Sequence, residues 1–388
     1  MKFILTFVLL IYLIFLNVHS FAKETSNGEN ILKIGLILPL SGKYQEIGKS
    51  VLNSVRLALS KINDNKIEIF PKNNYSDPEK TLHAAKQLEK EGIEIVIGPI
   101  FHKNLIYLEE VQNIIFLSLS NKTKIIPKNV ITIGINANSQ INAIVNFLKK
   151  EKLSKVIVLI PKSNYRNEIE SILDKSKYKF SNIYSYDVEP NELTNQIEQI
   201  TSYDERKKNL ERRIEILEKS DSYADENELE NLKKKYTLGE VNFDSVVIAD
   251  FGENLKSVTN SFSFSDVTTD TVKFFTLNQW FDETLLNENS INEIYFPSIE
   301  FKNYHKFRNS YLKKYRTYPS EISILSYDIL GLIYHLKKSL GNKLTKNVFN
   351  KNKSYVGEIG EFSFDNKTIN HELNIYQVIN NKFVEVTR

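Results

Sequence analysis

Short apolar runs rich in β-branched residues alternate with amphipathic segments between residues 32 and 276, and this alternation constrains the fold more than any other feature. The runs include ILKIGLILPL, IEIVIG, KVIVLI and FDSVVIAD, and the segments between them include SVLNSVRLALSKIN and SQINAIVNFLKKEKL. Nearly continuous apolar strands separated by helices are typical of parallel sheets that carry helices on both faces. One sheet holding all these strands would exceed the usual size of a single core, so we predict two α/β lobes.

The C-terminal part of the chain follows a different pattern. Two helical stretches, YHKFRNSYLKKY and EISILSYDILGLIYHLKKSL, are followed by short apolar runs that polar turns separate. These last runs predict antiparallel strands. The first passage from one lobe to the other is expected near residues 134–138, where a strand ends in the turn residues GINAN.

Residues 203–236 do not fit an α/β lobe, because they are highly charged and carry only a narrow apolar seam. The seam keeps heptad-like spacing on both sides of the polar break SDSYAD, through Tyr203, Leu210, Ile214, Leu217, Leu229, Leu232 and Tyr236. This pattern predicts a helical hairpin inserted into the second lobe. Two interpretations stay open: a solvated insertion without a role, and a protruding arm that contacts another protein.

The first residues have the layout of a secretory signal peptide. Lys2 precedes an apolar run over residues 3–18, and the small residues Ser20 and Ala22 follow it. We predict a signal peptide over residues 1–22 and a periplasmic mature chain, with an uncleaved N-terminal anchor as the alternative. The chain has no cysteine, so we expect no disulfide, no cysteine-ligated metal and no lipoprotein anchor.

The stretch GKYQEIGKS, residues 42–50, resembles a nucleotide-binding loop, but five residues separate Gly42 from Gly48. A P-loop has four residues there, so that successive backbone N–H groups surround the phosphate. Glu46 would also place a carboxylate beside the anion. We therefore expect a strand-to-helix turn and no nucleotide. The 51 Lys and Arg nearly balance the 48 Asp and Glu, so bulk charge indicates no nucleic-acid partner.

No catalytic or metal-binding motif stands out in the sequence. The six histidines lack H-E-x-x-H or other paired metal spacing, G-x-S-x-G is absent, and the acidic residues follow charged helix faces. We therefore expect no enzymatic activity, no cofactor and no metal.

Ligands of parallel α/β sheets bind outside the carboxyl ends of the strands. The loops expected there are rich in Ser, Asn, Gly and aromatic residues, which hydrogen-bond to or stack on a small polar ligand. Ordinary turn and helix-cap formation is the alternative for each loop. The candidate ligand-binding residues are Ser41, Tyr44, Phe101, His102, Ser118, Ser120, Asn121, Tyr165, Asp250 and Trp280.

The order of these motifs resembles the type I periplasmic binding proteins of the leucine/isoleucine/valine-binding family. IGLILPLSGKYQEIGKSVLNSVRLALSKIN is similar to the family's opening strand, Ser-Gly turn and first helix, and IEIVIGPI to its third strand and Gly-Pro turn. FRNSYLKKYRTYPSEISILSYDILGLIYHL is similar to its late helix pair, and GEIGEFSFD to its closing strands. The resemblance spans nearly the whole mature chain.

The resemblance implies two lobes that close on a ligand around three crossovers. On that basis we expect the first lobe at residues 31–137 and 300–350, and the second at 138–299 and 354–388. Amino-acid binders of the family usually carry small hydroxyl residues in the loop after the third strand, where this chain has Phe101 and His102.

A narrower resemblance is to the branch of penicillin-binding protein activators. It rests on GPIF, LSLSN, the insertion with YDERKKNLERRIEIL, TLGEVNFDSVVIADFGENL and TLNQWFDETLL. It implies a non-enzymatic factor whose partner is a peptidoglycan synthase. The broader resemblance implies the alternative, a solute-binding component of an ABC importer, whose partner is the permease and whose ligand is an amino acid or similar small polar molecule.

Overall fold

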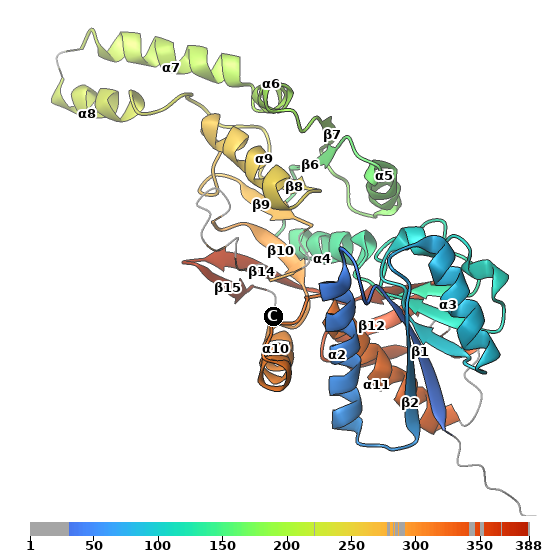
Figure 1. The fold of residues 1–388 in the computed structure, drawn as a ribbon. Helices are drawn as coiled ribbons and strands as arrows, with labels where there is room; N and C mark the ends of the chain where they lie inside the picture. Colours follow the sequence, from blue (N-terminus) through green and yellow to red (C-terminus); the bar gives the residue numbers. More distant parts are fainter. Residues whose placement is uncertain are drawn as a thin grey trace, which may run out of the picture.

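The structure, a computed structural model, describes residues 31–220, 222–277, 280–281, 283, 286, 292–340, 346–349, 353–365 and 367–386. The predicted signal peptide lies outside these residues. The described chain forms two lobes, each built on one mixed sheet of mostly parallel strands (Figure 1). This confirms the predicted α/β architecture. No helix in this part of the chain is long and apolar enough to cross a membrane.

The sheet of the first lobe has the strand order β11-β12-β13-β5-β4-β3-β1-β2. Its strands are β1 (Leu32–Leu38), β2 (Ile67–Asn73), β3 (Ile95–Ile97), β4 (Ile115–Ser118), β5 (Val130–Thr132), β11 (Ser354–Gly357), β12 (Gly360–Asp365) and β13 (Thr368–His371). The sheet of the second lobe has the order β15-β14-β10-β9-β8-β6-β7. Its strands are β6 (Val156–Pro161), β7 (Asn182–Tyr186), β8 (Ser245–Ile248), β9 (Lys273–Thr276), β10 (Tyr295–Ser298), β14 (Asn374–Ile379) and β15 (Lys382–Glu385).

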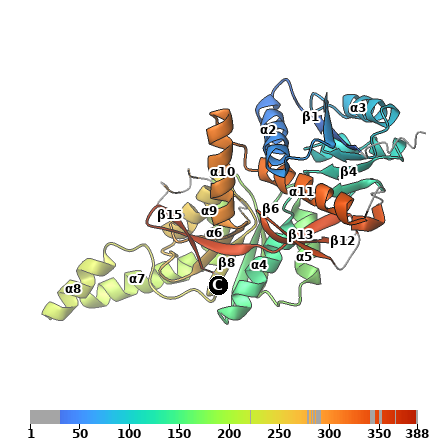
Figure 2. The same cartoon turned by 90° about the horizontal axis from the view of Figure 1, so that it is seen from below.

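Helices cover both sheets (Figure 2). In the first lobe these are α2 (Gln45–Ile62), α3 (Pro78–Lys90), α11 (Ser323–Leu340) and the short 3-10 helices η1 (His102–Leu105), η2 (Leu108–Glu110) and η5 (Lys346–Phe349). In the second lobe they are α4 (Ala137–Lys150), α5 (Arg166–Lys175), α6 (Pro190–Ile200) and α9 (Gly252–Phe264), while α10 (Phe301–Tyr315) follows the last parallel strand. The central strands are buried along their whole length, as the β-branched runs predict.

The stretch GKYQEIGKS forms the turn between β1 and α2. Gly42 has a φ of +77°, a conformation that favours glycine. Gly48 packs so closely on the backbone just after β1 that an added Cβ would lie 2.1 Å from the Pro39 carbonyl oxygen. The two glycines therefore serve a turn and a close backbone contact.

The described chain passes between the two sheets three times, after β5, after β10 and after β13. The expectation that residues 354–388 all lie in the second lobe is wrong for residues 354–371. β11, β12 and β13 extend the sheet of the first lobe, because Thr368 of β13 pairs in parallel with Thr132 of β5. Only β14 and β15 join the second sheet, as an antiparallel edge beside β10.

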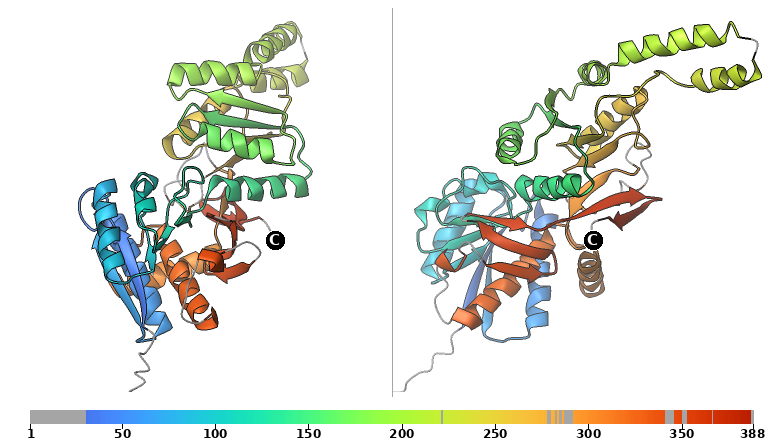
Figure 3. Two further views of the ribbon diagram at one scale, coloured as in Figure 1. Left: turned by 90° about the vertical axis from the view of Figure 1, so that its right-hand side faces the viewer. Right: turned by 180° about the vertical axis from the view of Figure 1, so that it is seen from behind.

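The predicted insertion is a helical hairpin of α7 (Tyr203–Leu217) and α8 (Tyr223–Leu232) that projects away from the second lobe (Figure 3). Its seam packs Leu210, Leu217 and Leu232 against each other. Tyr236, which the heptad spacing assigns to the seam, instead stacks on Phe264 at the end of α9, with ring centroids 5.0 Å apart.

Candidate functional site

The carboxyl ends of strands from both lobes meet at a pocket of about 460 Å³, here called the interlobe pocket. The first lobe contributes Asn121 and Lys122, which follow β4. The remaining wall comes from the starts of α4 and α5 and from the loops after β8 and β9: Ala137, Gln140, Tyr165, Glu168, Ile169, Ala249, Phe251, Leu277 and Trp280. Three predicted site residues, Asn121, Tyr165 and Trp280, therefore line one cavity.

Asp250 lies behind the interlobe pocket rather than in its wall, since it is only 3% exposed. Its carboxylate accepts hydrogen bonds from the Tyr186 hydroxyl at 2.6 Å, the Phe251 N–H at 2.9 Å and the Tyr165 hydroxyl at 3.4 Å. Burial, together with the charge of Asp250, raises the pKa of Tyr165 to about 12, so this hydroxyl stays protonated and remains a donor. Asp250 thus fixes the loop and the Tyr165 ring that form the pocket wall.

Glu168 joins the two lobes at the edge of this pocket. Its Oε1 atom accepts hydrogen bonds from the Thr123 hydroxyl at 2.6 Å and the Thr123 N–H at 3.2 Å. The Lys122 ammonium lies 3.7 Å from its Oε2 atom and 5.3 Å from the centroid of the Tyr165 ring. Lys124 adds a further link by donating to the Asn167 carbonyl oxygen at 3.1 Å.

His102 is the first residue of η1, and the charges of Lys122 and Glu168 affect its pKa. Burial is the largest cause that lowers the pKa of His102, the Lys122 charge lowers it further, and Glu168 acts in the opposite direction. Its Nδ1 atom is buried and has no hydrogen-bond partner among the described residues. The ring is therefore neutral at neutral pH.

Ser118 and Ser120 support the loop after β4 from within. Ser118 is fully buried, and its hydroxyl donates to the Pro99 carbonyl oxygen at 2.8 Å. Ser120 is 5% exposed, and its hydroxyl accepts a hydrogen bond from the Lys122 N–H at 3.2 Å. Both hydroxyls hold the backbone that presents Asn121 and Lys122, and neither lines the interlobe pocket.

Ser41, Tyr44 and Phe101 lie on the first lobe and are not among the residues that line the interlobe pocket. The Tyr44 and Phe101 rings lie 4.6 Å apart between centroids, and Ser41 accepts a 2.8 Å hydrogen bond from the Asn73 side chain. The Phe101 side chain in the loop after β3 thus packs against the Tyr44 ring of the same lobe.

The sequence analysis did not name Phe251 and Glu168 as candidate site residues, although both line the interlobe pocket. Phe251 lies within the loop ADFGEN, which the carboxyl-end rule does single out. Glu168 carries no such signal, because its partners come from the other lobe and it reads in the sequence as one more acid on a charged helix face.

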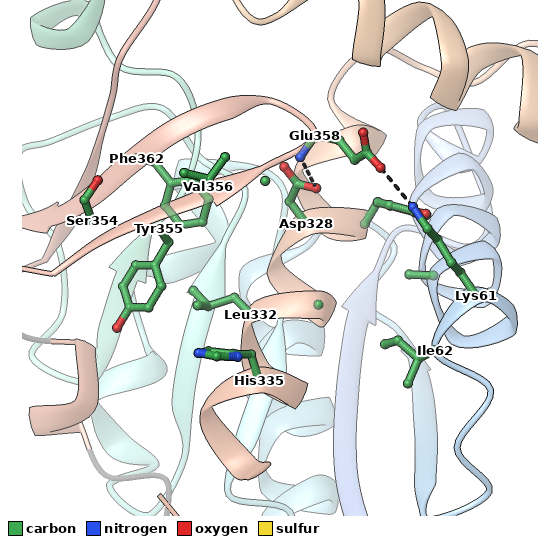
Figure 4. A pocket seen from close by; sticks show the side chains of 14 residues that line it. Lys61, Ile62, Asp328, Leu332, His335, Ser354, Tyr355, Val356, Glu358 and Phe362 are labelled. Atoms are coloured by element: carbon green, nitrogen blue, oxygen red, sulfur yellow. Dashed lines mark hydrogen bonds and ion pairs between the residues drawn. The ribbon is translucent and has the colours of Figure 1, made fainter. Parts of the chain in front are cut away.

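A larger cavity of about 770 Å³ lies on the first lobe alone, between α2, α11 and the β11–β12 hairpin (Figure 4). Its charged groups already have partners. Lys61 pairs with Glu358 at 2.9 Å, and Asp328 accepts from the Glu358 and Ile359 N–H groups at 3.0 Å and 2.8 Å. The interlobe pocket is smaller, but it remains the better candidate site because both lobes line it at the carboxyl ends of parallel strands.

Comparison with known proteins agrees with this fold. Residues 31–201 match the family described as "Periplasmic binding protein". An uncharacterised protein of Methanocaldococcus jannaschii is 25% identical over 188 residues, which are 43% of this chain and 45% of that protein. The chain thus spans less than half the length of this curated relative.

Three solved structures illustrate the similarity. The C-domain of LpoA from Haemophilus influenzae, a regulator of PBP1A, has a TM-score of 0.63 and 14% identity over 92% of this chain and 100% of that chain. The isoleucine complex of the branched-chain amino acid transporter substrate-binding protein LivJ from Streptococcus pneumoniae has a TM-score of 0.54 and 18% identity over 92% and 99%. A solute-binding protein of an ABC transporter from Rhodopseudomonas palustris, in complex with 3,4-dihydroxybenzoic acid, has a TM-score of 0.59 and 15% identity over 92% and 97%.

Topology, pocket position and comparisons together define the class: this chain has the two-lobed fold of the type I periplasmic binding proteins. Within that class, similar structures include both the regulator LpoA and solute-binding proteins of transporters, as the sequence resemblance predicts.

Proposed function

We propose that this protein is a non-enzymatic, exported factor that acts on peptidoglycan synthesis through protein contacts, as penicillin-binding protein activators do. The observation that carries the proposal is the α7–α8 hairpin, which projects from the second lobe (Figure 2). Its seam covers only the partner helix, so the outer faces of both helices stay exposed. The similarity to the LpoA C-domain supports the same reading.

The base of the hairpin is anchored firmly enough to present it as an arm. Arg206, 6% exposed, donates through Nε to the Gly239 carbonyl oxygen at 3.0 Å and through Nη1 to the Ser265 carbonyl oxygen at 2.9 Å. Leu238 N–H donates to the Arg206 carbonyl oxygen at 2.9 Å, which brings the two ends of the hairpin together. An anchored arm loses less conformational entropy on binding than a flexible one.

Site-specific photo-crosslinking in cells tests the contact. A photo-crosslinking residue replaces Ile216, which is 55% exposed on α7, and the matched control replaces Ile183, which is 44% exposed on β7. We expect position 216 to capture a peptidoglycan synthase and position 183 not to. Capture of an importer permease from position 216, with no synthase, would overturn the proposal.

The second candidate function is solute capture for an ABC importer, and the interlobe pocket favours it. A cavity between the lobes at the carboxyl ends of parallel strands is where such a protein would hold its ligand. Purified permease complex in membranes distinguishes the two functions: binding that depends on the ligand-filled pocket supports the importer, and absence of binding supports the activator.

A further inference from the structure

Seven of the eleven described residues that line the interlobe pocket are aliphatic or aromatic. Tyr165, Phe251 and Trp280 contribute aromatic rings, and aliphatic side chains complete the wall: Ala137, Ile169, Ala249 and Leu277. Phe251 is 60% exposed, so the pocket presents a large apolar ring that the described chain does not cover. Aromatic walls of this kind bind a planar apolar body better than a small polar one.

Neither acid at the pocket offers a ligand ammonium group a carboxylate of its own. Asp250 already accepts three hydrogen bonds, from Tyr186, Phe251 and Tyr165, and is 3% exposed. Glu168 has its Oε1 atom bonded twice to Thr123, and its Oε2 atom faces the Lys122 ammonium at 3.7 Å. An α-amino acid would have to bury its ammonium near the Lys122 ammonium and share the Glu168 Oε2 atom with it, which costs free energy.

A ligand carboxylate has a partner in Lys122. The Lys122 side chain is 40% exposed, and its ammonium is 3.7 Å from Glu168, beyond ordinary hydrogen-bond length. An ammonium carries three donors, so it can accept another anion. Three helix N-termini also favour negative charge, because Ala137, Tyr165 and Phe251 stand at the N-terminal ends of α4, α5 and α9. The Glu168 carboxylate opposes it, so the ligand carboxylate must lie on the side of Lys122 that faces away from Glu168.

We propose that the interlobe pocket binds an aromatic carboxylate, with its ring against Tyr165 and Phe251 and its carboxylate on Lys122. An α-amino acid is excluded as the preferred ligand. The inference deepens the second candidate function, since it names the ligand class of the same pocket, but it does not depend on any contact of the α7–α8 hairpin.

Calorimetry and thermal shift on the purified mature chain test this inference. The probes are benzoate, phenylacetate and indole-3-acetate, each with its neutral amide, together with isoleucine and phenylalanine. We expect at least one of the carboxylates to bind and raise the melting temperature, and its amide to bind about tenfold more weakly because the charged hydrogen bond is lost. Preferential binding of the amino acids, or no binding of any of the three carboxylates, would overturn the proposal.

Two variants with matched controls locate the binding site. Lys122→Gln should weaken carboxylate binding about tenfold, while Lys128→Gln, the same change at an exposed position farther along the same loop, should not. Phe251→Ala should weaken all the aromatic probes, whereas Phe264→Ala at the other end of α9 should not. Both Phe side chains are at least half exposed, so neither change should prevent folding. Equal effects of variant and control would contradict the assignment.

The result of the binding experiment is independent of the result of the crosslinking experiment that tests the proposed activator function. Loss of crosslinking at position 216 with intact carboxylate binding would refute the partner contact alone. Retained crosslinking without carboxylate binding would refute the ligand class alone.

Discussion

The Thr123 hydroxyl in the first lobe donates a 2.6 Å hydrogen bond to the Glu168 carboxylate at the start of α5 in the second lobe. This bond and the nearby Lys124–Asn167 bond link the lobes at the edge of the interlobe pocket. The two bonds keep the walls of the interlobe pocket facing each other.

Removing the interlobe bond should open the pocket. Glu168→Ala leaves Thr123 without its partner, and we expect a larger radius of gyration in small-angle X-ray scattering. The matched control is Glu170→Ala on the same helix, where the carboxylate pairs with Arg166 of α5 and not with the first lobe among the described residues. An unchanged radius for Glu168→Ala would show that other contacts hold the lobes.

Asp250 should contribute to the stability of the fold and not directly to ligand binding. Asp250→Asn disturbs three hydrogen bonds at a buried site, and we expect the free energy of unfolding to fall by about 2–4 kcal/mol. Asp270→Asn, at an exposed position, should change it by less than about 0.5 kcal/mol. Denaturant titration measures both free energies of unfolding. An Asp250→Asn protein that is as stable as the wild type but no longer binds ligand would show that Asp250 contacts the ligand directly.

His371 should make stability depend on pH. Burial lowers the pKa of His371 in the folded chain to about 4 from 6.5, and its bond to the Ile133 carbonyl oxygen offsets only part of this effect. The unfolded chain then binds a proton more readily, so this contribution to stability is complete above pH 6.5 and is lost as the pH falls toward about 4.

The measurement compares the wild type with His371→Gln by denaturant unfolding at neutral and at mildly acidic pH. We expect the wild type to lose up to about 3 kcal/mol more than the variant on acidification. Asp328, whose pKa burial raises to about 6, acts in the opposite direction, because its contribution falls as the pH rises. It is present in both proteins and cancels in the difference. Parallel pH profiles would contradict a buried neutral His371.

Arg206 should control how firmly the α7–α8 hairpin is attached. Arg206→Met removes both bonds to carbonyl oxygens, and we expect a loss of about 2–4 kcal/mol in local stability with faster proteolysis within residues 203–236. Arg212→Met, an exposed position on the same helix, is the control. Equal cleavage rates for the two variants would show that the seam alone holds the hairpin in place.

The sequence predicts the local elements of this fold better than their long-range pairing. β-branched runs such as KVIVLI become buried parallel strands because their composition suits a sheet covered on both faces. Residues 354–371 are correctly expected as antiparallel strands, but their lobe is decided by pairing with β5 more than two hundred residues away, which no local pattern encodes.

The candidate site shows the same division. The carboxyl-end rule finds the loops that carry Asn121, Tyr165 and Trp280, all of which line the interlobe pocket. It does not give side-chain direction, and Ser118 turns inward to the Pro99 carbonyl oxygen. Glu168 was out of reach for a different reason, since its role arises only when the second lobe meets the first.

The proposed action on peptidoglycan synthesis is tested most directly with a purified synthase. The measurement compares its polymerisation rate with the intact mature chain and with a variant in which a short Gly-Ser linker replaces residues 209–233, which leaves the contact between Arg206 and Leu238 in place. We predict that the intact chain raises the rate and that the shortened chain does not. Equal stimulation by both proteins, or stimulation by neither, would contradict the proposal that the hairpin acts on the synthase.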